Sequence, residues 1–220
     1  MTIALHLDAV TKAYPEHPEL LRGITLDVLQ GQTVALLGRS GSGKTTLLRI
    51  IAGLESADSG RVFLGGSDIS GIPVENRNIG YMFQGFALFP HLNVEQNIAF
   101  GLEVRRVKKN DVKARVRELL SMVDLEGFEK RSVHQLSAGQ KQRVAFARAL
   151  APAPRLLLLD EPMSALDEEL KLQLLSDLRS LIERTSLTSI YVTHDQKEAA
   201  VIASTIVRLE SGQILSTISS

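Results

Sequence analysis

Gly38-Arg39-Ser40-Gly41-Ser42-Gly43-Lys44-Thr45 is the stretch of this chain that decides its fold. It matches the pattern G-x-x-x-x-G-K-[ST], in which glycines let backbone N–H groups turn toward phosphate oxygens and the lysine reaches the β and γ phosphates. An apolar run, 34–37, precedes it and an amphipathic stretch, 44–52, follows it, so the loop leads from a strand into a helix N-terminus. We therefore predict a nucleotide site formed by Gly38, Ser40, Gly41, Ser42, Gly43, Lys44, Thr45 and Thr46, with the Thr45 hydroxyl as a Mg²⁺ ligand.

Outward from this loop, short runs of branched residues alternate with helical stretches. Strands are expected at 3–10, 24–28, 33–37, 61–64, 79–83, 155–159, 189–192 and 206–209, and helices at 44–52, 111–123, 137–150, 166–184 and 196–203. This alternation indicates an α/β fold with a mostly parallel sheet. The early strands are expected to form a small antiparallel sheet, because no helix separates them. Residues 86–150 contain no convincing strand and are expected to form an inserted helical subdomain.

Composition excludes several classes of function. The 220 residues are 44% hydrophobic, and 25 basic residues balance 25 acidic ones, so no nucleic-acid partner is expected. The chain has no cysteine, which excludes disulfides and cysteine-based zinc sites. The first ten residues lack the features of a signal peptide, and the longest aliphatic run, 156–159, is far too short to span a bilayer. We expect a soluble chain whose membrane role, if any, comes through a partner.

Two acids follow the aliphatic run directly. In open α/β sheets ligands lie beyond the carboxyl ends of the strands, and carboxylates buried there are costly unless a metal or proton chemistry uses them. Asp160 suits the role of holding Mg²⁺, and Glu161 that of orienting and deprotonating an attacking water. An acidic loop that caps the next helix is the alternative.

Leu136-Ser137-Ala138-Gly139-Gln140 resembles the L-S-G-G-Q signature of ABC ATPases, and it lies between the phosphate loop and Asp160, in that family's order. Alone it could be an ordinary N-capped helix, because Ser137 is a good cap. The resemblance covers the whole chain. Ala138 replaces the first glycine of the signature, and Arg39 stands where the family often has proline.

The resemblance also implies roles for residues outside the loop. Tyr14 would stack on adenine, Gln84 would contact Mg²⁺ and the attacking water, and His194 would bond the γ-phosphate. Glu161, His194 and Gln84 are thus the catalytic candidates, and Thr45, Gln84 and Asp160 the metal candidates. Asp167, at the end of the D-loop, is a further nucleotide candidate. Ser137, Gly139 and Gln140 would meet ATP held by a second subunit.

The family's mechanism implies partners. Two ATP-binding subunits, expected to be two copies of this chain, would clamp ATP between them and drive integral membrane permease subunits from the cytoplasmic face of the membrane. The segment 86–94 resembles importers of sulfate, molybdate, ferric iron, polyamines and sugars, which implies a substrate-binding protein in the complex. Exposed aromatic residues there would receive a coupling helix of the permease. The C-terminal regulatory domain of many such relatives is expected to be absent, because the chain ends soon after Gly212.

Three other functions compete with this interpretation. A soluble ABC ATPase acting on DNA or ribosomes usually has paired cassettes, coiled-coil arms or basic insertions, and the sequence has none of these. A phosphate-loop kinase would need an acceptor site and no signature. A nucleotide-gated assembly subunit would not need Glu161 and His194.

Overall fold

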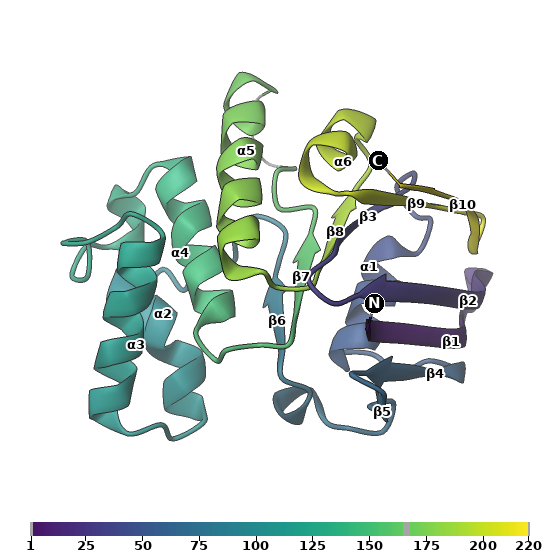
Figure 1. The fold of residues 1–220 in the computed structure, drawn as a ribbon, viewed down its shortest axis with the longest axis horizontal. Helices are drawn as coiled ribbons and strands as arrows, with labels where there is room; N and C mark the ends of the chain where they lie inside the picture. Colours follow the sequence, from purple (N-terminus) through teal and green to yellow (C-terminus); the bar gives the residue numbers. More distant parts are fainter. Residues whose placement is uncertain (1, 165–167, 220) are drawn as a thin grey trace.

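The computed structural model describes residues 2–164 and 168–219, which form two sheets with helices around them (Figure 1). The larger sheet has the order β10-β9-β3-β8-β7-β6, and β10 alone pairs in the antiparallel sense. The smaller sheet, β2-β1-β4-β5, is antiparallel throughout. This is the predicted α/β class with a mostly parallel sheet and a small antiparallel one.

The bounds of the elements are as follows. The strands are β1 (Ile3–Tyr14), β2 (His17–Leu29), β3 (Thr33–Leu37), β4 (Ser59–Leu64), β5 (Ser67–Asp68), β6 (Ile79–Met82), β7 (Leu156–Asp160), β8 (Ser189–Thr193), β9 (Thr205–Glu210) and β10 (Gln213–Ser219). The helices are α1 (Lys44–Ala52), α2 (Val94–Val104), α3 (Lys109–Met122), α4 (Ala138–Leu150), α5 (Glu168–Thr185) and α6 (Gln196–Ile202), with 3-10 turns η1 (Val74–Asn76) and η2 (Val133–Gln135).

Successive side chains of the central strands point to opposite faces of the larger sheet, and this divides the core into two layers. Val34 and Leu36 of β3 pack on one face with α1 and the small sheet, whereas Ala35 packs on the other face with α4, α5 and α6. β7 follows the same rule, with Leu156 and Leu158 on the α1 side and Leu157 and Leu159 on the opposite side. Because both faces are covered, these strands consist almost entirely of apolar residues.

The connection between β6 and β7 contains α2, α3 and α4, which stand together at one end of the molecule (Figure 1). α2 begins with a capping box in which Asn93 and Gln96 satisfy each other's backbone N–H groups, and α4 begins with the same device at Ser137 and Gln140. The sequence prediction gave this region no separate helix at 94–104. Buried Asn97 holds the loop ahead of α2 by bonding the backbone of Phe89, Leu92 and Asn93.

The expected exposure of the aromatic segment is wrong for Phe86. Its backbone adopts a left-handed conformation (φ 66°), and its ring turns into the core, leaving only 7% exposed. The exposed aromatic rings of this region are instead Phe83, next to Gln84 in the chain, and Phe100 of α2, each 41% exposed. Phe89 is half-buried and packs on Phe100, with 4.5 Å between the ring centroids.

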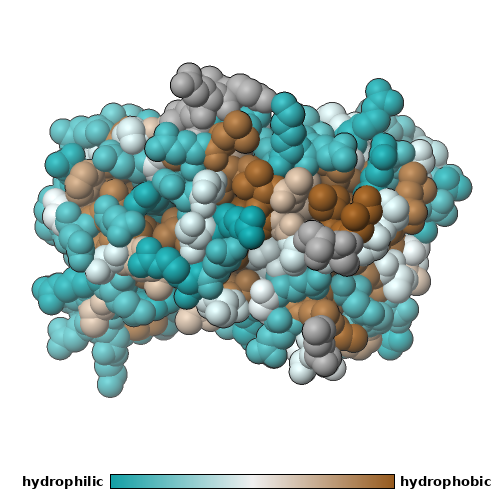
Figure 2. All heavy atoms as spheres, turned by 45° about the horizontal axis from the view of Figure 1, so that its top comes forward, coloured by the Kyte–Doolittle hydropathy of each residue, from teal (hydrophilic) through white to brown (hydrophobic). Residues whose placement is uncertain are grey.

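Apolar surface gathers toward the middle of the face shown in Figure 2, with hydrophilic side chains around it. Within residues 2–164 and 168–219, no helix is both long enough and apolar enough to span a bilayer.

Candidate functional site

The phosphate loop joins the carboxyl end of β3 to the N-terminus of α1. Gly43, the residue before the helix, has φ 95°, and no side chain caps the first helical N–H groups. These donors therefore remain open to an anion. A side chain at Gly38 would place its Cβ 2.3 Å from the carbonyl oxygen of Leu209, so the loop requires glycine there.

The loop contains a buried amine and a buried hydroxyl oxygen. The Lys44 amine donates to the carbonyl oxygens of Gly38 (2.8 Å) and Arg39 (2.9 Å) and is 4% exposed. Burial lowers the pKa of Lys44, while the nearby carboxylates of Glu161 and Asp160 act in the opposite direction. Ser42 Oγ is the one buried side-chain polar atom without a hydrogen-bond partner in the described part of the chain. An unsatisfied hydroxyl in a glycine loop is the kind of donor that a phosphate oxygen satisfies.

Asp160 ends β7 with both carboxylate oxygens engaged. Oδ1 accepts a hydrogen bond from Thr45 Oγ1, and Oδ2 accepts one from the Tyr81 hydroxyl, each at 2.9 Å. Burial, and secondarily the charge of Asp160, raises the pKa of Tyr81, which therefore stays a proton donor. The sequence analysis missed Tyr81. No signal in the sequence pointed to it, because the pairing of β6 with β7 that brings Tyr81 to Asp160 is known only from the structure.

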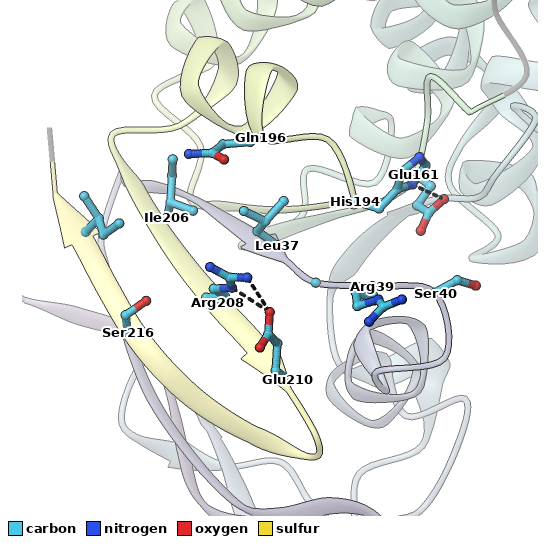
Figure 3. A pocket seen from close by; sticks show the side chains of 12 residues that line it. Leu37, Arg39, Ser40, Glu161, His194, Gln196, Ile206, Arg208, Glu210 and Ser216 are labelled. Carbon is cyan, nitrogen blue, oxygen red and sulfur yellow. Dashed lines mark hydrogen bonds and ion pairs between the residues drawn. The ribbon is translucent and has the colours of Figure 1, made fainter.

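Glu161 faces two basic side chains from different elements. Its backbone is left-handed (φ 42°), and its N–H donates to the Val192 carbonyl oxygen at 3.2 Å, which fixes it to β8. Oε1 lies 3.8 Å from the Lys44 amine, and Oε2 lies 3.4 Å from His194 Nδ1. The carboxylate thus stands between the phosphate loop and the end of β8, where Figure 3 shows its contact with His194.

A cavity of about 420 Å³ joins most of the predicted residues. It is lined by Tyr14, Ser40, Gly41, Gly43, Lys44, Thr45, Thr46, Gln84 and Glu161, together with His17 and Leu20. A second cavity of about 550 Å³ shares Ser40 and Glu161 with the first and extends past His194 to Ile206 and Arg208 (Figure 3). The site is therefore open on two sides of Glu161.

Tyr14 and Gln84 lie on the rim of the first cavity. The Tyr14 hydroxyl donates to the Glu55 carboxylate, and the Lys12 amine lies 5.4 Å from the ring centroid. Gln84 is exposed, and its Nε2 donates to Ser164 Oγ at 3.0 Å. Gln84 follows β6 and Ser164 follows β7, so this bond links the connections after the two neighbouring strands.

The structure does not bring Ser137, Gly139 and Gln140 into either cavity. Ser137 caps α4, where its hydroxyl accepts from the Gln140 N–H at 3.3 Å. Gly139 lies against Leu174 of α5, where an added Cβ would come within 2.7 Å of Leu174 Cδ2. The remaining candidate, Asp167, lies outside the described residues.

Among the described side chains, no group of three or more His, Asp or Glu is arranged to hold a metal. Thr45 and Asp160 nevertheless present a hydroxyl and a carboxylate to each other, and such hard oxygen donors suit Mg²⁺, which binds through few protein ligands and keeps several waters. The donor set is therefore chemically compatible with magnesium bound together with a nucleotide.

Comparison with known proteins gives concordant results. Residues 21–164 match the protein family described as "ABC transporter". The chain is 54% identical over 198 residues to the sulfate/thiosulfate import ATP-binding protein CysA of Xylella fastidiosa, covering 88% of this chain and 57% of that protein. It is 47% identical over 213 residues to the probable sulfate/thiosulfate import ATP-binding protein CysA of Chlorella vulgaris, covering 97% and 90%.

A solved structure is similar over nearly the whole chain. The ATP-binding cassette MJ0796, described as dimeric, in a post-hydrolysis state and bound to ADP and Pi, superposes with a TM-score of 0.82 at 32% identity, covering 98% of each chain.

Proposed function

Because the chain belongs to the ABC transporter family, we propose that it binds and hydrolyses ATP to drive solute import through membrane permease subunits. The observation that carries the proposal is the position of Glu161 between the Lys44 amine and the His194 ring at the end of the phosphate loop. The chain spans 57% of the length of the Xylella relative.

The nucleotide would bind with its phosphates on the loop and its base at Tyr14. The uncapped N-terminus of α1 and the unpartnered Ser42 hydroxyl supply donors for phosphate oxygens. Lys44 would exchange the Gly38 and Arg39 carbonyl oxygens for phosphate oxygens, which better compensate a buried ammonium. One face of the Tyr14 ring is near Lys12, and the other would be used for stacking.

Magnesium would be held by Thr45 and Asp160, with Gln84 contributing from the rim of the cavity. When bound, the ion would supply positive charge that neutralises the phosphates. Tyr81 holds the second oxygen of Asp160 and so fixes the direction in which the carboxylate faces.

Glu161 is proposed as the group that accepts a proton from the attacking water. Its backbone is tied to Val192, so the carboxylate position is determined by β7 and β8 rather than by a flexible loop. His194 contacts one oxygen of Glu161 and would hold the γ-phosphate on the same side. Both residues line the cavity shown in Figure 3, which gives water access to the carboxylate.

A second copy of the chain would complete the site. Ser137, Gly139 and Gln140 begin a helix whose N-terminus suits an anion, yet they line neither cavity of their own chain. A head-to-tail dimer would place them on the γ-phosphate of the ATP that the partner subunit binds. The dimeric state of the similar ATP-binding cassette supports this arrangement.

The permease would dock beside Gln84. Phe83 is exposed next to Gln84 in the chain, and Phe100, also exposed, packs on Phe89 of the loop that Asn97 holds in one shape, so the surface is apolar and preorganised. Since relatives named for sulfate/thiosulfate import are about half identical to this chain, we propose a sulfate-like oxyanion as the solute. A substrate-binding protein would deliver it, and the chain would work at the cytoplasmic face of the membrane.

The test combines activity with isolation of partners. The chain should hydrolyse ATP in the presence of Mg²⁺, and Lys44→Ala should lose most of this activity. Isolation of the chain from its own membranes should recover a permease, and sulfate uptake should fail when the gene is deleted. Near-wild-type hydrolysis by Lys44→Ala would contradict the nucleotide site. Recovery of ribosomes or DNA in place of a permease would support the soluble alternative.

A further inference from the structure

Glu198 is a buried carboxylate at the meeting point of three elements. It lies on α6 and is 4% exposed. Oε2 accepts hydrogen bonds from the hydroxyls of Thr193 (2.7 Å) and Tyr191 (3.0 Å), both on β8. Oε1 lies 3.3 Å from the amine of Lys171, on α5. A charge buried to this degree is retained only where partners compensate it, and here each oxygen has a partner.

The chain segments that carry Glu198 and Lys171 also carry the two residues of the contact between His194 and Glu161. Glu161 and Lys171 both belong to the segment that leaves β7 and enters α5, and His194 and Glu198 both belong to the segment that leaves β8 and enters α6. Glu161 meets His194 at 3.4 Å, and Lys171 meets Glu198 at 3.3 Å. The two segments are therefore joined by two acid–base contacts, one at the site and one behind it. α5 and α6 pack together along this junction (Figure 1).

Hydrogen bonds that lead to Glu198 hold the backbone on both sides of His194. Thr193 Oγ1 donates to Glu198 and accepts a hydrogen bond from the Asp195 N–H at 3.0 Å. These two residues flank His194, whose own ring is 56% exposed and contacts Glu161. Because so much of the ring lies in solvent, its position is determined chiefly by the backbone that Thr193 and Asp195 hold.

We propose that Glu198, together with Lys171, is a positioning residue that sets the approach of His194 to Glu161. Neither Glu198 nor Lys171 lines the two cavities at the site, so neither would touch a nucleotide bound there. They act by fixing the segment after β8 against the segment after β7. The inference rests on the proposed function, because it concerns the geometry of the residues that hydrolyse ATP.

The test compares turnover with nucleotide affinity in matched variants of the full chain. Glu198→Gln keeps the size of the side chain and its contacts with the hydroxyls but removes the charge that Lys171 meets. We expect kcat for ATP to fall about ten- to a hundredfold, the range that small misplacements of catalytic groups produce. KM should stay within about twofold, since Tyr14, Lys44 and the loop are unchanged. Lys171→Met should have the same effect. Glu183→Gln, on the exposed face of α5 where Glu183 pairs with Arg179, is the control.

The double variant Glu198→Gln/Lys171→Met separates positioning from folding. It removes both charges, so thermal stability should recover part of what either single variant loses, whereas kcat should stay low. If kcat recovers together with stability, the contact only supports the fold and the inference is wrong. It is equally wrong if Glu198→Gln keeps wild-type kcat while Glu161→Gln is inactive. If Glu161→Gln itself hydrolyses ATP normally, Glu161 is not the base, and the role given to its contact with His194 fails before Glu198 is tested; normal hydrolysis by Lys44→Ala would instead contradict the proposed function.

Discussion

Glu161→Gln tests the chemistry of the site most directly. The amide keeps the size of the side chain and its place between Lys44 and His194, but it can no longer accept a proton from water. General-base catalysis is typically worth about 10²–10⁴ in rate. Turnover should fall by that factor, which corresponds to about 3–5 kcal/mol of activation free energy.

The same substitution should preserve or raise the affinity for ATP. The Glu161 carboxylate lies 3.8 Å from the Lys44 amine and is 22% exposed. At an effective dielectric constant of about 20, this pair interacts by roughly 4 kcal/mol, and solvent around the carboxylate reduces that value. The neutral amide removes a competitor for Lys44 and a negative charge that repels the phosphates. We therefore expect the ATP-bound state to form readily and to persist.

Two measurements check this prediction. Single-turnover hydrolysis gives the rate of the chemical step, and size-exclusion chromatography with ATP should reveal a stable dimer of Glu161→Gln beside a mostly monomeric wild type. Adding Ser137→Arg should abolish the dimer, because the start of α4 would be blocked. The control Glu183→Gln should resemble the wild type in both assays. Normal hydrolysis by Glu161→Gln would assign the base to another group, with His194 the next candidate, and a dimer that forms equally without nucleotide would refute the role of ATP in joining the subunits.

Three further predictions concern the periphery of the site and the fold. Tyr14→Ala should raise KM for ATP by about five- to 150-fold, the equivalent of losing ~1–3 kcal/mol of stacking, whereas Tyr14→Phe should not; unchanged affinity in the alanine variant would exclude stacking. Phe100→Glu, at a ring that is 41% exposed, should leave ATP binding intact and abolish solute uptake in cells, and retained uptake would place the docking surface elsewhere. Arg77→Met should destabilise the chain by about 3–5 kcal/mol in denaturant titrations, because the buried guanidinium donates to four backbone carbonyl oxygens, two of them at the end of α1; a loss below ~1 kcal/mol would contradict that count of bonds.

The central part of the site was predictable because it follows local rules. A glycine loop between a strand and a helix, and two acids at the end of an aliphatic strand, meet at the same edge of a parallel sheet wherever the strands lie close together. Lys44, Thr45, Asp160 and Glu161 therefore came together as expected.

What the sequence did not predict depends on contacts between distant elements. Tyr81 bonds Asp160, which is 79 residues away, and Glu198 pairs with Lys171 of α5, and a lone tyrosine or glutamate gives no sign of such a partner. The sequence analysis expected residues 86–150 to be helical but gave α2 no bounds of its own, although Asn93 and Gln96 form a capping box and Val94, Ile98 and Leu102 recur at helical spacing. Phe86 was expected at the surface since its backbone conformation, which turns the ring inward, is not encoded in residue type.

The position of α1 links nucleotide binding to the stability of the protein in the cell. The helix packs against strands of both sheets, and its last carbonyl oxygens are bound by Arg77. A phosphate group bound at the N-terminus of α1 would stabilise only the folded state, in which both sheets are assembled around the helix. Bound nucleotide would therefore raise the free energy of unfolding in proportion to the logarithm of the nucleotide concentration. In a cell that runs short of ATP, the chain would thus be inactive and also more readily unfolded and degraded. Protease resistance measured with and without nucleotide would report how far the nucleotide site is occupied.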